Sequence, residues 1–130
     1  MTIVDTSVWI DLLDGTNTPE TSWLTEHIHT VEIGVLDLIL CEVLQGVSSD
    51  NIAEDLLARF RHYRIYNTNR TLAVRSAQNY RRLRKQGFTI RGTIDSLIAT
   101  FCIDNGMWLL HRDRDFNPFE DRLRMRVVHP

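Results

Sequence analysis

Residues 2–15, TIVDTSVWIDLLDG, join a short strand pattern to the start of a helix. The β-branched run at 2–4 is typical of a strand, and it ends at Asp5. Apolar residues then recur at helical spacing before a glycine: Val8, Trp9, Leu12 and Leu13, with Gly15 as the stop. Since Asp-Thr-Ser is good capping chemistry, the stretch predicts a strand, a turn and a helix.

The same alternation continues along the chain. Further strands are predicted within residues 31–36, 64–67, 107–111 and 125–128, and helices within 18–29, 37–47, 49–63, 69–87 and 92–106. In these helices we expect Cys41, Ile52, Leu57 and Cys102 to face the core, and Thr93 to cap the last. Strands that alternate with helices predict an α/β fold, with a parallel sheet of four to five strands flanked by helices in three layers.

Length and composition indicate an ordinary globular protein. At 130 residues and 43% hydrophobic residues, the chain is expected to form a single domain over 1–130. No basic leader precedes the first strand, and no apolar run approaches the roughly 20 residues that span a bilayer. With two cysteines that lack metal-ligand spacing, we expect a cytoplasmic protein with reduced thiols and no membrane partner.

Charge is distributed unevenly. Residues 1–57 contain eleven acidic residues and no Lys or Arg, whereas 58–130 contain all fifteen basic residues and six acidic ones. In one folded domain this can place an acidic zone beside a basic one, as a metal-dependent enzyme acting on a polyanion needs. The alternative is a set of charges scattered over a solvated surface.

Acidic residues occupy positions where α/β proteins build their sites, outside the carboxyl ends of parallel strands. Asp5 ends the first strand, and Asp113 and Asp115 follow the strand at 107–111. Glu42 stands inside the apolar stretch LILCEVL, where a buried carboxylate must be paired, protonated or bound to a cation. Asp95 lies in the first turn of the helix at 92–106.

Each acid alone also has a structural explanation. Asp5 can cap a helix, Asp95 can favour a helix N-terminus, and Glu42 can meet a buried arginine. Asp113 and Asp115, two apart in an extended segment, share one face and can form salt bridges to neighbouring arginines. The functional interpretation rests on the occurrence of all of them together.

In order along the chain, the stretches IVDTSVWIDLL, LILCEVLQGV, TIDSLIATF and LLHRDRDF resemble the four acidic motifs of PIN-domain ribonucleases, particularly the VapC-like toxins of toxin-antitoxin pairs. The resemblance covers nearly the whole chain. It implies a PIN-like fold, metal-dependent cleavage of an RNA substrate, homodimers, and a small cognate antitoxin protein as partner. It also implies the catalytic residues Asp5, Glu42, Asp95, Asp113 and Asp115, with Asp113 preferred over Asp115 as the fourth position.

The chemistry of these residues favours a hard metal ion. They supply oxygen ligands only, which suit Mg²⁺, or Mn²⁺, better than zinc. We expect Asp5, Asp95 and Asp113 to be the metal ligands. Two further expectations concern arginines: Arg112 and Arg114 hold the acids or the substrate, and Arg75, Arg82 and Lys85 contact RNA phosphates from the helix at 69–87. A solvated helix face is the alternative for the latter three.

Other classes of function are less consistent with the sequence. A receiver domain needs a lysine in the site, and the single lysine, Lys85, lies far from any strand end. A phosphatase of the D-x-D type lacks its second aspartate after Asp5. The remaining alternative is a catalytically silent PIN-like binding module that acts through a protein or RNA partner.

Overall fold

A computed structural model describes residues 1–130 and shows an α/β fold built on one five-stranded sheet. The strands are β1 (Thr2–Val4), β2 (Ile33–Leu36), β3 (Arg64–Tyr66), β4 (Trp108–Leu110) and β5 (Arg126–Val127). Their order is β3-β2-β1-β4-β5, and every neighbouring pair is parallel. The predicted fold class is therefore confirmed, with five strands.

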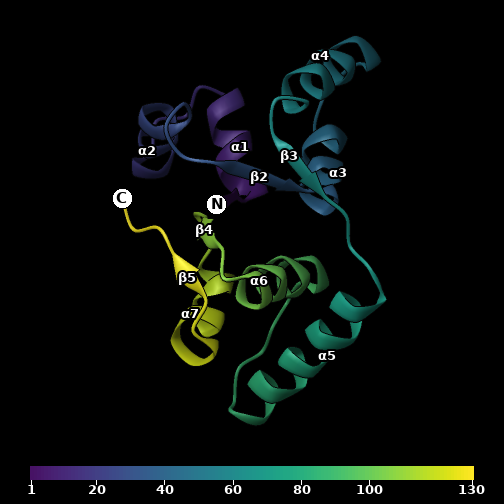
Figure 1. Ribbon diagram of the computed structural model, residues 1–130, viewed down its shortest axis with the longest axis vertical. Helices are drawn as coiled ribbons and strands as arrows, with labels where there is room; N and C mark the ends of the chain where they lie inside the picture. Colours follow the sequence, from purple (N-terminus) through teal and green to yellow (C-terminus); the bar gives the residue numbers. More distant parts are fainter.

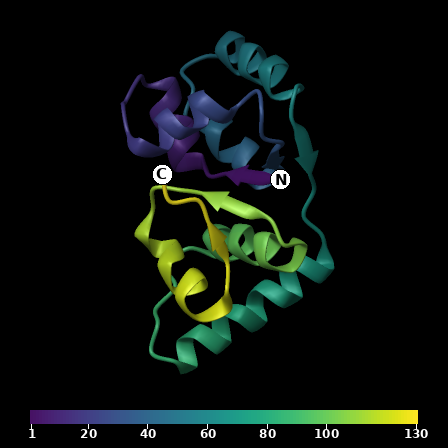
Figure 2. The same cartoon turned by 60° about the vertical axis from the view of Figure 1, so that its left-hand side comes forward.

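Seven helices flank the sheet. They are α1 (Thr6–Leu13), α2 (Pro19–His27), α3 (Asp37–Gln45), α4 (Asp50–Phe60), α5 (Arg70–Lys85), α6 (Thr93–Asn105) and α7 (Asn117–Leu123). Figure 1 shows α1 to α4 in the upper half of the molecule and α5 to α7 in the lower half. The turned view keeps this division, with β4 and β5 beside α6 and α7 (Figure 2). No helix has the length and apolar character that crossing a membrane requires.

The order of the strands determines where a site can form. From β1 the chain adds β2 and β3 on one side, and then crosses to add β4 and β5 on the other. The segments that leave β1 and β4 therefore diverge, and a site is expected at the carboxyl ends of these two strands. The backbone N–H of Asp5 donates to the carbonyl of Leu110 at 2.9 Å, so the two strand ends are adjacent.

The core contains the apolar residues of β1, β2 and β4 and the inner faces of the helices. Ile3, Val35 and Leu109 are fully buried within it. Trp9 of α1 is also buried, and its ring lies edge-on against Phe60 of α4 with centroids 5.0 Å apart. Burial of aliphatic and aromatic side chains of this size supplies the main favourable term in folding.

Several sequence-based expectations were wrong. Ile52 and Leu57 of α4 are 45% and 39% exposed rather than inward, and Cys41 is exposed, whereas Cys102 is buried as expected. The N-cap of α6 is Gly92 rather than Thr93, and no side chain caps that end. Helix α7 was not predicted, because seven residues that begin with Asn-Pro give little helical periodicity.

Candidate active site

Asp5 is fixed at the start of α1, directly after β1. It is the N-cap of the helix, and its carboxylate accepts hydrogen bonds from the Ser7 backbone N–H at 3.1 Å and the Ser7 hydroxyl at 2.6 Å. The side chain is buried, with 4% exposed. Burial raises the pKa of Asp5, although the hydrogen bonds from Ser7 favour its ionised form, and the charge of Asp113 raises it further. Capping therefore explains the position of Asp5 but leaves its charge without a basic partner.

Asp113 and Asp115 are brought together by a tight turn rather than by an extended strand. Strand β4 ends at Leu110, and a short 3₁₀ helix spans Arg114–Phe116. Asp113 caps this helix by accepting a hydrogen bond from the Asp115 backbone N–H at 2.9 Å. The expected alternation along an extended segment was thus wrong, and the two carboxylates are neighbours because of the cap.

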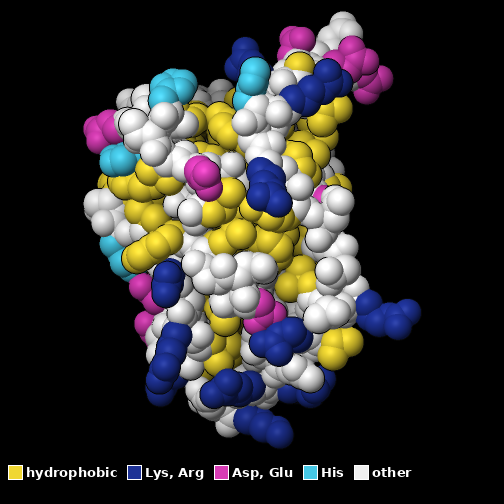
Figure 3. All heavy atoms as spheres, viewed as in Figure 1, with side chains coloured by type: hydrophobic (Ala, Val, Ile, Leu, Met, Phe, Trp, Pro, Cys, Tyr) yellow, Lys and Arg dark blue, Asp and Glu magenta, His cyan; other side chains and the backbone are white.

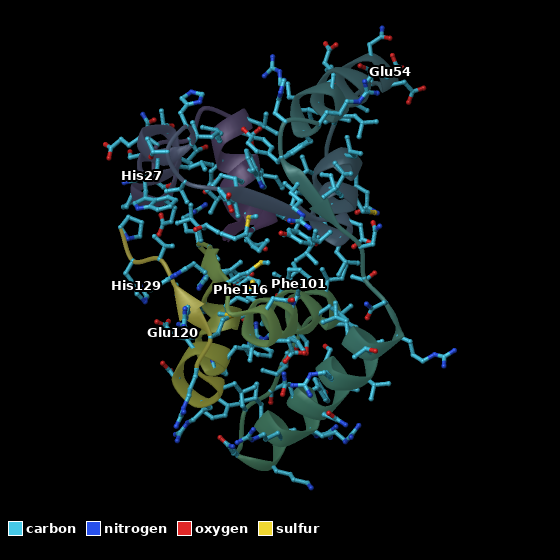
Figure 4. The ribbon with its side chains drawn as sticks, in the orientation of Figure 1. His27, Glu54, Phe101, Phe116, Glu120 and His129 are labelled. Carbon is cyan, nitrogen blue, oxygen red and sulfur yellow. The ribbon has the colours of Figure 1, made fainter.

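The turn is anchored in the core by Phe116, which is fully buried and lies toward the middle of the molecule in the view of Figure 4. The His111 ring contacts Phe116, with ring centroids 4.8 Å apart. The Nδ1 atom of His111 accepts a hydrogen bond from the Asp113 backbone N–H at 3.1 Å. Burial lowers the pKa of His111, so the neutral imidazole that accepts this bond is favoured.

Asp95, in the first turn of α6, meets this pair. One carboxylate oxygen from each of Asp95, Asp113 and Asp115 lies within 4.8 Å of the others. We refer to these three residues as the acidic cluster. Asp95 is half-buried, and burial raises its pKa to about 7. Four neighbouring carboxylates contribute to that shift: Asp5, Asp113, Glu42 and Asp115.

Glu42 lies on α3, the helix that follows β2, the neighbour of β1. Its Oε1 accepts a hydrogen bond from the hydroxyl of Thr6 at 2.7 Å. The side chain is half-buried rather than fully enclosed as its apolar neighbours suggested, and its partner is a hydroxyl rather than an arginine. Glu42 lies near enough to raise the pKa of Asp95, but it is not one of the three residues whose oxygens meet.

The arginines of this segment do not neutralise the acidic cluster. The guanidinium of Arg112 binds Asp11 of α1 through two hydrogen bonds, of 2.6 and 3.0 Å. Arg114 is exposed and forms no ion pair. The expectation that these arginines hold the acids of the site was therefore wrong, and their contact with the substrate stays a prediction. The backbone N–H of Arg112 instead donates to the Ser7 hydroxyl at 3.2 Å, which links the segments after β1 and β4.

Sequence reasoning missed Asp11 and understated the positioning roles of Ser7, Thr6 and His111. Asp11 is 8% exposed overall, and its position among apolar residues of α1 was a signal that a partner was needed. The partner is Arg112, 101 positions away in the sequence. It is brought to Asp11 because β1 and β4 are neighbouring strands.

Like charges so close together need a proton or a cation between them. The cluster holds oxygen atoms only, so a hard divalent ion such as Mg²⁺ or Mn²⁺ fits its donor set better than zinc, which prefers nitrogen and sulfur. Burial and the neighbouring carboxylates raise the pKa of Asp95, and a bound cation would offset both effects. The arrangement can bind a metal ion and orient a phosphate group beside it.

Comparison with known proteins gives a consistent family. A model described as PIN domain matches residues 2–121. The protein named ribonuclease VapC11, from Mycobacterium tuberculosis, is 28% identical over 120 residues, which cover 90% of each chain. A toxin-antitoxin complex from Klebsiella pneumoniae contains a chain with 18% identity and a TM-score of 0.76, covering 100% of this chain and 98% of its own. VapBC-1 of nontypeable Haemophilus influenzae gives 14% identity and a TM-score of 0.78, with coverage of 98% and 96%.

Proposed function

Because the chain belongs to the PIN domain family, we propose that it is a metal-dependent endoribonuclease that hydrolyses RNA phosphodiester bonds. The observation that carries the proposal is the meeting of Asp95, Asp113 and Asp115 beside the carboxyl ends of β1 and β4, with no basic side chain paired to any of them. Buried Asp5, at the end of β1, lies near enough to raise the pKa of Asp95, although it is not one of the three residues whose oxygens meet. An uncompensated group of carboxylates costs stability unless it binds a cation, so its presence favours a metal site.

Asp5, Asp95 and Asp113 are the proposed ligands of Mg²⁺ or Mn²⁺. When bound, such an ion supplies Lewis acidity and lowers the pKa of a water molecule beside the scissile phosphate. Asp115, joined to Asp113 by the turn, adds negative charge that favours the cation. Each ligand is held by its own local structure, by Ser7 for Asp5 and by the 3₁₀ turn for Asp113.

Glu42 has a separate proposed role. Because Thr6 occupies Oε1, the second oxygen of Glu42 is available to orient a water molecule and accept its proton. Thr6 is itself buried in the first turn of α1, so it positions Glu42 relative to Asp5. The acidic cluster then serves to bind the phosphate group through the metal ion, and Glu42 serves to accept the proton of the water.

We extend the proposal to the biological role of a toxin in a toxin-antitoxin pair. The support is the similarity in sequence to proteins named VapC ribonucleases and in fold to chains of toxin-antitoxin complexes. A small cognate antitoxin protein, a homodimeric state and a cytoplasmic location, where RNA is available, belong to this proposal.

Expression in a bacterial host tests the function. Induced wild type is expected to arrest growth and to produce new RNA 5′ ends, whereas Asp113→Asn at equal protein level produces neither. Arrest by both proteins without new RNA ends would instead favour a catalytically silent PIN-like binding module.

A further inference from the structure

A groove of about 400 Å³ lies between α5 and α6, outside the acidic cluster. Ala73 and Ala77 of α5 leave it open, because their side chains are small. Its deeper wall holds Ser76 and Ser96, whose hydroxyls are buried and joined by a hydrogen bond of 2.9 Å. The groove is thus a stable feature of the packing of the two helices.

Other lining residues offer groups that recognise nucleotides. Tyr80 is half-buried and presents an aromatic ring, and Arg81 is exposed beside it. Thr93 adds a hydroxyl at the start of α6. An aromatic ring, a guanidinium and hydroxyls together can stack on a base, bind a phosphate and accept or donate hydrogen bonds to base edges.

The groove and the acidic cluster occupy opposite sides of the same helix end. Thr93, Ser96 and Leu97 line the groove, while Asp95, in the same first turn, belongs to the cluster. The two places are therefore separated by about the width of one helix, roughly 10 Å. Between them lies the N-terminus of α6, which no side chain caps, and whose dipole favours a phosphate.

The charge beside the groove favours a polyanion. The last turns of α5 carry four exposed cations that form no ion pair: Arg81, Arg82, Arg84 and Lys85. Figure 3 shows Lys and Arg side chains gathered over the lower part of the molecule, where Figure 1 places α5 to α7. Arg75, by contrast, forms hydrogen bonds to Asp104 through two of its guanidinium nitrogens, so part of its charge is already paired.

We propose that this groove binds one nucleotide of a single-stranded RNA that crosses the N-terminus of α6 from the acidic cluster. The base lies against Tyr80, and the following phosphates contact Arg81 and the cations at the end of α5. This assignment rests on the proposed nuclease function and adds a subsite through which neighbouring sequence affects cleavage. A second copy of this chain suits the groove less well, because a symmetric contact would bring the same cations of two molecules together.

The test measures RNA binding apart from cleavage. The dissociation constant of a fluorescently labelled single-stranded RNA of mixed sequence is measured by anisotropy in EDTA. Ala77→Leu fills the groove with a residue that favours helix as well, and Arg81→Ala removes a cation from an exposed position. Their matched controls on α4 and its end are Ala58→Leu and Arg61→Ala, both exposed residues outside the groove.

Ala77→Leu is expected to weaken binding about tenfold, as loss of one stacked base would. Arg81→Ala is expected to lower the salt dependence by the equivalent of about one phosphate contact, while both controls bind like wild type. Unchanged binding in both groove variants would overturn the proposal. Sedimentation that shows Ala77→Leu converting a dimer into a monomer would also overturn it, in favour of a protein interface.

These results are separable from those of the nuclease proposal. If wild type cleaves RNA with Mg²⁺ but the groove variants bind RNA as tightly as wild type, only the groove proposal is disproved. Groove-dependent binding without any metal-dependent cleavage would instead disprove the nuclease function and leave an RNA-binding surface.

Discussion

Two groups of carboxylates at the same end of the sheet have opposite environments. Asp11 accepts hydrogen bonds from two of the three nitrogens of the Arg112 guanidinium, Nε and Nη2, and this pair joins α1 to the segment after β4. Asp95, Asp113 and Asp115 meet one another instead, with no cation beside them. The paired acid is explained by structure, whereas the unpaired acids oppose folding unless something positive binds. The difference supports the proposal that the unpaired acids bind a ligand.

The largest expected effect is on RNA cleavage, which should differ between variants of the unpaired acids and of the paired Asp11. Asp95→Asn removes one charge and one proposed metal ligand, and is expected to reduce RNA cleavage by about 10²–10³-fold or more. Asp11→Asn, a few residues from Asp5 but outside the acidic cluster, is expected to retain most of the cleavage. Initial rates on a labelled RNA with Mg²⁺ measure both. Equal losses in the two variants would remove the distinction between paired and unpaired acids.

Metal binding is expected to stabilise the folded protein through the acidic cluster and not through Asp11. A ligand that binds the folded state alone, at a hundred times its dissociation constant, raises the free energy of unfolding by about 2.7 kcal/mol. Thermal melting of wild type should therefore rise with Mg²⁺ or Mn²⁺, while Asp95→Asn shows little shift and Asp11→Asn shifts like wild type. An identical rise in all three proteins would indicate metal binding somewhere else.

The pH dependence of stability sharpens the comparison. Burial raises the pKa of Asp95 to about 7 in the folded protein, from an ordinary value of 3.8. Between these values the folded state binds a proton that the unfolded chain has released, so this residue makes the free energy of unfolding fall as pH rises. In EDTA, urea unfolding at about pH 5 and about pH 8 should show wild type losing more stability than Asp95→Asn. Parallel losses would mean that Asp95 does not carry the shift.

The smallest expected effect concerns the paired acid. The Asp11 side chain is 11% exposed and that of Arg112 is 50% exposed, so solvent screens much of their attraction. Asp11→Asn is expected to lower the free energy of unfolding by about 1 kcal/mol, measured by urea denaturation at neutral pH. A loss as large as that of a core residue would show that the pair does more than tie α1 to the segment after β4.

Most of the fold could be predicted from the sequence, because its strands are short β-branched or aliphatic runs bounded by turn residues. All five were expected, and their parallel arrangement followed from the helices between them. Failures came where local pattern and tertiary packing disagree. Ile52 and Leu57 have helical spacing but face outward, since only Leu56 and Phe60 of α4 reach the core.

The candidate site was predictable to the extent that parallel strands bring their carboxyl ends to one edge. That rule places Asp5 and Asp113 near each other, and the start of α6 adds Asp95. The partners of individual side chains were not predictable, because they depend on loop geometry. Asp115 reaches Asp113 through a 3₁₀ turn, and Arg112 turns away to Asp11 rather than toward the acidic cluster.

RNA cleavage by the purified protein in Mg²⁺, Mn²⁺ or EDTA tests the central claim most directly, with Asp5→Asn and Asp113→Asn measured beside wild type. The account predicts cutting by wild type with metal, none in EDTA, and loss of cutting in both variants. Cleavage that persists in EDTA, or that survives in either variant, would contradict a metal site built from the ends of β1 and β4.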